Sequence, residues 1–304
     1  MPRTALFNRQ LLHGFNDYVN FAKHPAGIFF VGSTVAGAAN RADFGSNPDT
    51  PFLNLTYAIG QATDSVGDVI YLLPGHVETV TAAAGLVFNK IGLTVIGIGE
   101  GALRPIIRLT TINTADVDFD AASVTIENVE FQAGRADIVA ALDINATDVT
   151  LRRCRFVEQG ANLNALIWIQ DAAAAGSDRI TVEDCVAIDV DAGAAGTHFI
   201  NFAGTGTEHI FRRNTLIGDW GTMAIGGAGV VTRATVCDNY VYNIATDADC
   251  GINFAATATG VMFRNLVCTG HASASSITAQ GFAKCQNYGG IIADSNGLLE
   301  PIAT

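Results

Sequence analysis

The sequence predicts an all-β solenoid, in which one chain winds into stacked parallel coils with three short strands in each coil. Two observations predict this fold. Similar segments recur every 25 to 31 residues along most of the chain. Within each of them, three short runs of alternating apolar residues are separated by tight turns. Such repetition of a small unit is typical of solenoids, whose neighbouring units bury one continuous core.

A charge alternation between successive repeats predicts how the coils stack. The repeats align on one apolar residue each: Val95, Ile126, Leu151, Val182, Phe211, Val236 and Phe263. The residue after it, from the second repeat onward, is Glu127, Arg152, Glu183, Arg212, Cys237 and Arg264, and the next is Asn128, Arg153, Asp184, Arg213, Asp238 and Asn265. Parallel strands about 4.8 Å apart would place each acid beside a base. At the bend that follows, Asn214 is expected above Asn239 as an amide ladder.

The ends of the chain differ from the repeats. We expect residues 1–26 to form an amphipathic helical arm, a capping helix near 50–63 to start at Thr50 and Pro51, the solenoid to occupy 27–285, and 286–304 to be a C-terminal capping tail. One face of the arm is apolar and consists of Leu11, Leu12, Phe15, Tyr18 and Val19. This face either packs back on the tube or docks onto a neighbouring subunit or a larger particle, and we favour docking because a cap already exists.

Composition excludes several classes of partner. The 304 residues are 49% hydrophobic and carry a net charge of −12 with only 17 Lys and Arg, which argues against nucleic acid and against an anionic membrane surface. Neither a signal-peptide pattern nor a run of 18 apolar residues stands in the sequence. We therefore expect a soluble protein that is synthesised in the cytoplasm.

Six cysteines are spread along the chain without a CxxC motif, so neither a zinc site nor a redox motif is expected. Cys154 and Cys185 fall on adjacent coils of one inward column. Parallel stacking aims both side chains the same way, which predicts packed thiols and no disulfide.

At this point the residues resemble the right-handed parallel β-helix of pectin-lyase type. The segment GSNPDTPFLNLTYAIGQA, followed by GDVIYLLPGHVET, is similar to the start of that fold, where a capping helix precedes a strand and a turn. The segments VTIENVEF, VTLRRCRF and ITVEDCVA resemble its repeated strand, turn and strand. This resemblance covers residues 45 to 285 and implies the fold. The helical arm ahead of a short acidic array also resembles β-helix proteins of tailed-phage virions, such as capsid decorations, spikes and fibres.

The sequence departs from the catalytic patterns of that family. The Asn-Thr-Asp, paired Asp and Gly-His-Gly signatures of the polygalacturonase branch are missing, and so is the arginine motif of the pectate-lyase branch. The family patterns therefore assign no catalytic residue.

One stretch of the third strand still carries candidate chemistry. Its outward positions are expected to include Asp118, Asp143 and Trp168, two carboxylates on neighbouring coils followed by an indole. They could form a glycosidase pair with a sugar-binding platform, or hold calcium together with Asp116 and Asp120. The competing interpretation is a solvated acidic face. Asp118, Asp143 and Trp168 are our candidate glycan-binding residues.

The histidines and one glycine-rich segment are expected to be structural. His76 beside Glu78 resembles a proton-transfer pair but lacks a third partner, and His198 and His209 match no zinc spacing. GIGEG at 97–101 lacks the GK[ST] of a phosphate loop and is interpreted as a coil corner that needs positive φ. No metal and no cofactor is expected.

Taken together, these features predict a non-enzymatic structural protein of a phage-like virion, as a capsid decoration, spike or fibre. It would be a homotrimer that attaches to capsid or tail proteins through its arm, with host-surface polysaccharide as a further partner and no nucleic acid or membrane. The alternative is a polysaccharide lyase or glycoside hydrolase that acts on the outer β-helix face at Asp118, Asp143 and Trp168.

Overall fold

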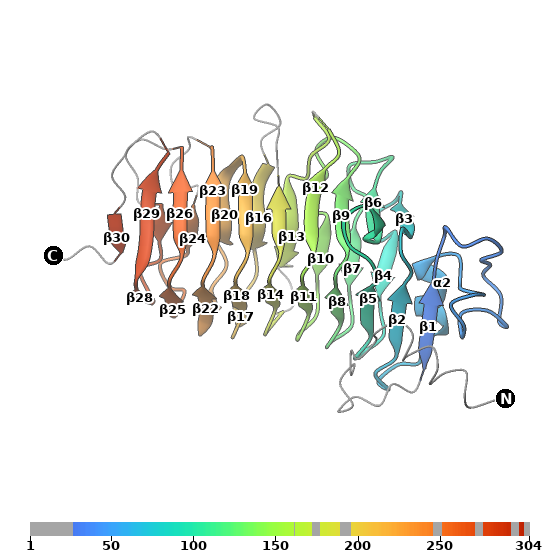
Figure 1. The fold of residues 1–304 in the computed structure, drawn as a ribbon. Helices are drawn as coiled ribbons and strands as arrows, with labels where there is room; N and C mark the ends of the chain where they lie inside the picture. Colours follow the sequence, from blue (N-terminus) through green and yellow to red (C-terminus); the bar gives the residue numbers. More distant parts are fainter. Residues whose placement is uncertain are drawn as a thin grey trace.

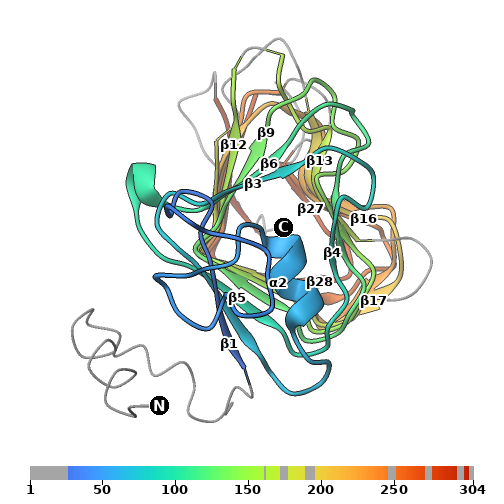
Figure 2. The same ribbon diagram turned by 90° about the vertical axis from the view of Figure 1, so that its right-hand side faces the viewer.

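The computed structural model describes residues 27–160, 162–171, 177–188, 196–245, 251–270, 276–292 and 298–300. The chain winds into an elongated tube of stacked coils (Figure 1). Viewed along its axis, the tube is enclosed by three walls of strands (Figure 2). Named strands pair in parallel throughout the described residues, except where β30 pairs antiparallel with β29. The prediction of a right-handed parallel β-helix with three strands per coil is confirmed.

Each wall is one sheet, and we name the sheets A, B and C in the order in which a coil passes through them. Sheet A contains β1 (Ile28–Val31), β2 (Val69–Leu72), β5 (Thr94–Gly97), β8 (Thr125–Glu127), β11 (Thr150–Arg152), β14 (Thr181–Glu183), β18 (Ile210–Arg212), β22 (Ala234–Cys237), β25 (Gly260–Phe263) and β28 (Phe282–Cys285). Sheet B contains β3 (Val77–Val80), β6 (Ile106–Leu109), β9 (Glu130–Ala133), β12 (Arg155–Glu158), β15 (Val186–Ile188), β19 (Thr215–Gly218), β23 (Tyr240–Asn243), β26 (Leu266–Thr269), β29 (Asn287–Ile291) and β30 (Leu298–Glu300).

Sheet C forms the third wall, with a small satellite sheet at its corner. Sheet C contains β4 (Leu86–Phe88), β7 (Val117–Phe119), β10 (Leu142–Ile144), β13 (Ile167–Asp171), β16 (Gly196–Phe202), β20 (Trp220–Gly227), β24 (Ile252–Phe254) and β27 (Ile277–Thr278). The satellite pairs β17 (Gly206–Thr207) with β21 (Val231–Thr232). The last parallel strand, β29, lies within the segment that the sequence assigned to the C-terminal tail, and β30 pairs with its edge.

The inward rows have the register that the repeats predict. Ile126, Leu151 and Val182 are register partners on successive strands of sheet A, and each is fully buried. The row ends differently from the prediction, because Met262, and not Phe263, pairs with Val236. Met262 is fully buried whereas Phe263 is only partly buried, so the last repeat is shifted by one residue relative to our alignment.

The predicted charge alternation appears as ion pairs between coils. Arg213 binds Asp184 through Nε and Nη2, at 2.6 and 2.8 Å, and Arg264 binds Asp238 in the same way. Glu183 lies between two arginines and accepts from Nε of Arg152 at 2.7 Å. Because of the one-residue shift, Arg264 belongs to the second column of charges and not to the first.

A buried amide ladder follows the bend between sheets A and B. It is longer than predicted, since Asn265 and Asn287 continue the column of Asn214 and Asn239. The side-chain oxygens of Asn239, Asn265 and Asn287 each accept from the backbone N–H and the side-chain amide of the asparagine on the preceding coil, and that of Asn214 accepts from the N–H of Cys185. Hydrogen-bonded side chains of this kind fix the conformation of the bend in these coils.

The N-terminal end of the tube is covered by α2 (Leu55–Gln61), as Figure 2 shows. The capping helix is confirmed, but its start was predicted too early. Asn54 caps it, since its Oδ1 accepts from the N–H of Tyr57 at 2.9 Å, whereas Thr50 and Pro51 precede the helix. An asparagine with extended backbone satisfies the free N–H groups of a first turn as well as threonine does.

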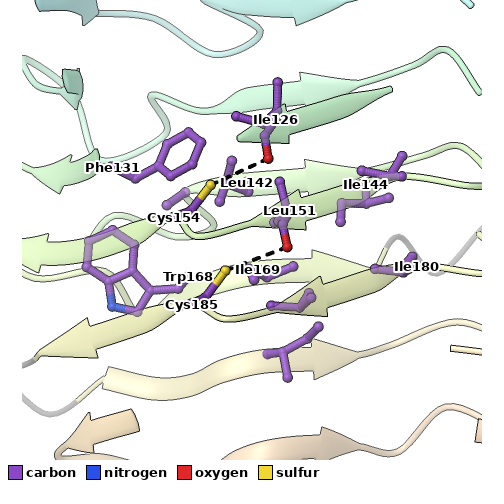
Figure 3. Packing of buried hydrophobic residues seen from close by; sticks show 14 of the residues in the cluster. Ile126, Phe131, Leu142, Ile144, Leu151, Cys154, Trp168, Ile169, Ile180 and Cys185 are labelled. Carbon is purple, nitrogen blue, oxygen red and sulfur yellow. Dashed lines mark hydrogen bonds between the residues drawn. The ribbon is translucent and has the colours of Figure 1, made fainter. Parts of the chain in front are cut away.

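The interior of the tube is filled with branched and aromatic side chains (Figure 3). Phe131 and Phe156 stack on adjacent coils with ring centroids 5.4 Å apart. Cys154 and Cys185 are buried free thiols that face the carbonyl oxygens of Ile126 and Leu151 at 3.7 and 3.6 Å. The prediction of packed thiols in this column is confirmed.

Candidate active site on the outer face of sheet C

Two carboxylates lie side by side on the outer face of sheet C. Asp118 on β7 and Asp143 on β10 are register partners, flanked by inward residues that are fully buried. Neighbouring strands lie about 4.8 Å apart, so side chains at paired outward positions are direct neighbours. The sequence-based prediction that these two aspartates share one face on adjacent coils is confirmed.

Two further aspartates surround this pair, but each already has a structural partner. Asp116 accepts from the N–H of Ala84 at 2.5 Å. Asp120 accepts from the side-chain amide of Asn145 at 3.1 Å. Asp118 and Asp143, in contrast, accept no hydrogen bond from another described residue, and Oδ1 of Asp143 is inaccessible to solvent without such a partner.

The environment raises the pKa of both central carboxyls. Burial raises the pKa of Asp118 to about 6, with further contributions from the charges of Asp116, Asp120 and Asp143. Burial also raises the pKa of Asp143, together with the charges of Asp116 and Asp120. Partial desolvation and like charges both favour the neutral form of a carboxylic acid, and the charge of an ionised Asp143 helps Asp118 to keep its proton.

Trp168 lies elsewhere than predicted. Its side chain is 1% exposed and packs inside the tube, edge-on to Phe156 with centroids 5.5 Å apart (Figure 3). The predicted orientation of Trp168 on the outer face is therefore wrong. Ile169 and Asp171, and not Ile167 and Ile169, are the register partners of Leu142 and Ile144. The indole lies within β13, between Ile167 and Ile169, which both pair with β16.

The outward neighbour of Asp143 is Gln170. The column continues along the tube axis through Asn201, Gly226, Asn253 and Thr278. Nδ2 of Asn201 donates to Oε1 of Gln170 at 3.1 Å. These polar side chains form a strip that extends from the carboxylate pair, and amides can both donate to and accept from sugar hydroxyls. The sequence alone did not place Gln170 beside Asp143. In the segment IWIQD, alternation predicts Ile167 and Ile169 as the inward pair, which puts Trp168 at the outward position instead.

Gly226 leaves a gap in this polar strip. Its φ is +151°, and a Cβ atom there would lie 1.6 Å from the carbonyl oxygen of Asn253. Only glycine fits so close an approach of two backbones. The strip therefore has no side chain between Asn201 and Asn253.

One carboxyl group of sheet C, that of Asp171 on β13, points into the tube. Asp171 is fully buried, accepts a short hydrogen bond from the hydroxyl of Ser177, and has no partner for Oδ2 among the described residues. Burial, followed by the charges of Asp143 and Asp178, raises the pKa of Asp171 to about 8. We conclude that Asp171 is protonated in the folded protein at neutral pH.

Asp171→Asn is expected to remove a pH dependence of folding. The pKa of Asp171 rises on folding from about 3.9 to about 8. Between these pH values the unfolded chain is ionised at Asp171 while the folded protein keeps the proton, so the native protein loses stability as pH rises. The stability of the variant relative to the native protein should increase by up to about 1.4 kcal/mol per pH unit over this window. Urea unfolding at pH 5, 6 and 7 measures this difference; Asp43→Asn, at an exposed carboxylate, should show almost none. A constant difference for Asp171→Asn would contradict the assignment.

The histidines have the structural roles that were predicted. His76 is fully buried; its Nδ1 accepts from the N–H of Ser33 at 3.0 Å, and its Nε2 lies 3.3 Å from Glu78. Burial lowers the pKa of His198 and that of His209 to about 4. Nδ1 of His209 accepts from the N–H of Ile180 at 3.1 Å. The lowered pKa keeps His198 and His209 neutral, and His76 and His209 each accept a hydrogen bond from the backbone of another segment.

The glycine-rich segment at 97–101 forms a coil corner, as predicted. Gly99 and Gly101 have φ of +114° and +56°. The side-chain amide of Asn128 donates to the carbonyl oxygens of Gly97 and Gly99 at 2.8 and 2.9 Å, so the corner carbonyls face a protein donor.

The structure does not test the docking residues that the sequence suggested. The predicted docking residues Leu11, Leu12, Phe15, Tyr18 and Val19 lie outside the described residues. Within the described ranges, no group of three or more His, Cys, Asp or Glu side chains is arranged to hold a metal ion. No helix in the described part of the chain is long and apolar enough to cross a membrane.

Comparison with known proteins gives matches among solved structures. No protein-family model matches the sequence, and the search of curated proteins finds no match. A rhamnogalacturonan lyase matches with a TM-score of 0.47 and 13% identity, over 80% of this chain and 68% of that one. Pectate lyase Pel9A matches with a TM-score of 0.42 and 13% identity, over 93% and 83% of the two chains. A GH136 lacto-N-biosidase from Eubacterium ramulus matches with a TM-score of 0.43 and 10% identity, over 94% and 69%.

These likenesses concern the pectate-lyase-like β-helix fold, and no substrate or residue role is transferred from them. By their names, however, all of the matched proteins are glycan-degrading enzymes. This finding contradicts the sequence-based prediction of a non-enzymatic protein, which is wrong. The absence of family signatures in the sequence was an insufficient reason to exclude catalysis, because two suitably placed carboxylates need no such signature.

Proposed function

We propose that the chain is a glycoside hydrolase that cleaves a neutral glycan between the carboxyl groups of Asp118 and Asp143. The observation that carries the proposal is their pairing in register on the outer face of adjacent strands, without a hydrogen-bond partner for either among the described residues. The strand spacing of about 4.8 Å suits the separation of about 5 to 5.5 Å between the carboxyl groups of a retaining glycosidase.

The two groups would play different roles in this reaction. Asp118, whose pKa is raised to about 6, donates its proton to the leaving glycosidic oxygen as that bond to the anomeric carbon breaks. Asp143 attacks the anomeric carbon and forms a glycosyl ester. Water then adds to this carbon, its proton passes to Asp118, and the Asp143 carboxylate is released.

The polar strip beside the pair supports binding of an extended substrate. Gln170, Asn201 and Asn253 follow Asp143 along one register column, in which Gly226 is the one member before Asn253 without a side chain. Each amide offers both donors and acceptors, which suits the hydroxyls of a sugar chain that runs along the tube axis. The proposed substrate therefore contacts several coils.

The charge of this face favours a neutral glycan over a uronate polymer. Asp116 and Asp120 surround the pair and add two more carboxylates, so the carboxylates of an acidic polysaccharide would be repelled. A lyase that acts on such polymers is for this reason the weaker of the two enzymatic alternatives.

Product analysis tests the proposal. The purified chain is incubated with neutral and with acidic polysaccharides, and both reducing ends and unsaturated ends are measured. We expect reducing ends from a neutral glycan, with the anomeric configuration retained in the first product seen by NMR. Unsaturated ends from an acidic polymer, or inversion of configuration, would contradict the assigned chemistry.

Attachment to a phage-like virion through the arm and assembly as a homotrimer stay predictions from the sequence. The arm lies outside the described residues. Co-purification with a particle and the mass of the assembled protein in solution are the measurements that test them.

A further inference from the structure

A groove lies on a different wall of the tube, on the outer face of sheet A. It crosses β8, β11, β14 and β18, which follow one another along the tube (Figure 1). Its volume is about 430 Å³, within the range typical of small-molecule sites. The proposed hydrolysis at sheet C uses none of its residues.

The floor of the groove is a column of hydroxyl groups. Thr125, Thr150 and Thr181 are register partners on three successive strands, and all three are partly exposed. They are therefore spaced about 4.8 Å apart along the tube axis. Ile210 continues the column and gives one end of the floor an apolar surface. Each hydroxyl can both donate and accept a hydrogen bond.

One rim of the groove carries charges that neutralise each other. Asp148 accepts from Nε and Nη2 of Arg179 at 2.6 and 2.9 Å, and Glu208 lies 3.2 Å from Nε of Arg233. The hydrogen bond from Arg179 lowers the pKa of Asp148, which keeps this ion pair charged. A charged ligand would have to compete with these intramolecular partners.

A second column of charges lies on the other side of the floor and does not itself line the groove. Two residues after Thr150, Thr181 and Ile210 it presents Arg152, Glu183 and Arg212, and Nε of both arginines donates to Glu183, at 2.7 and 2.6 Å. Asp148 and Arg152 flank Thr150 along the chain, so the sign of charge alternates across the floor as well as along it. The groove has many hydrogen-bonding groups but no unpaired charge of one sign along its length.

We infer that this groove is a second carbohydrate-binding site, which takes a short segment of an uncharged glycan. An uncharged polyol matches the hydroxyl floor through neutral hydrogen bonds, and it leaves the ion pairs on both sides of the floor intact. A uronate or sulfated chain would face the carboxylates of Asp148, Glu183 and Glu208 in turn. The site would hold the glycan on one wall of the tube while the proposed reaction takes place on another.

The experiment measures binding without hydrolysis. Asp143→Asn is used as the common background, so that binding at sheet A is read separately from cleavage at sheet C. Calorimetric titration with malto-, cello- and manno-oligosaccharides supplies the uncharged probes, and oligogalacturonate is the charged probe. At least one uncharged probe should bind, and its affinity should change by less than about twofold when salt is raised, because no ion pair forms with the ligand.

Two sets of valine variants locate the site. Thr150→Val with Thr181→Val removes two hydroxyls at nearly constant volume and should weaken binding about tenfold, as expected for the loss of two neutral hydrogen bonds. Thr94→Val is the matched control, because Thr94 stands in the same column next to Thr125 but does not line the groove. It should bind with unchanged affinity.

Three results would overturn the inference: no binding of any uncharged probe, tighter binding of oligogalacturonate, or equal affinity in the groove variants and the control. Binding that follows the threonines in a chain that cleaves no glycan would support the groove while refuting the proposed hydrolase. Glycan cleavage by a protein that binds no glycan at the groove would support the proposed hydrolase and refute the second binding site.

Discussion

Asp143→Asn is expected to lower the kcat of glycan cleavage by about 10²- to 10⁴-fold while the protein stays folded. The amide has the shape of the carboxyl group but cannot attack the anomeric carbon. Oδ1 of Asp143 has no hydrogen-bond partner among the described residues, so the substitution breaks no intramolecular bond of that atom. The release of reducing ends, measured with native and variant protein at equal concentration, checks this result.

Asp238→Asn is the matched control for this prediction. It makes the same chemical change at a carboxylate that pairs with Arg264 on another part of the tube. The loss of an exposed ion pair costs about 0.2 to 1 kcal/mol of stability and should leave kcat unchanged. If both variants lose activity equally, or if Asp143→Asn remains fully active, Asp143 is not a reacting group.

Asn239→Ala is expected to cost about 3 to 5 kcal/mol of unfolding free energy, the largest loss of stability among our predictions. In the buried amide ladder, the side chain of Asn239 lies between those of Asn214 and Asn265 and is hydrogen-bonded to both. Without its side chain, the buried N–H of Asn214 and the carbonyl oxygen of Phe211 lose their partners. Each buried polar group left unsatisfied costs about 1 to 3 kcal/mol.

Chemical unfolding measures this loss, and Asn145→Ala serves as its control. Asn145 makes one exposed hydrogen bond to Asp120 at 3.1 Å, so its removal should cost well under about 1 kcal/mol. Equal midpoints for the two variants would show that the ladder contributes no more than a surface contact.

The sequence was sufficient for the fold because the repeats carry both an apolar and a charge pattern. Leu151 and Val182 can be aligned because both are apolar. The opposite charges of Arg213 and Asp184 then exclude an alignment of the repeats that is shifted by one coil. The one-residue slip at Phe263 occurred in a repeat where the charge pattern no longer constrains the alignment, since Cys237 interrupts the first column. Register follows the side chains that must be buried, and Met262 fills that place.

The site was only half predictable. Asp118 and Asp143 follow from strict alternation on two well-aligned strands. Gln170 was missed because Asp171 points inward, and an alternation rule assigns a carboxylate to the solvent side. A buried carboxyl becomes acceptable only when it is protonated and bonded, here to Ser177. The hydrogen bond that stabilises the buried carboxyl joins Asp171 to a residue outside its strand, so the alternation of residues along that strand does not reveal it.

The central claim is that Asp118 is the proton donor of a glycan-cleaving pair, and the pH profile of kcat/KM tests it most directly. If Asp118 is this donor, activity falls as pH rises through about 6, the pKa of Asp118. The variant Asp116→Asn, which removes a charge that raises this pKa, should move the fall to lower pH. A profile that is flat through pH 6, or a limb that stays in place in Asp116→Asn, would contradict it.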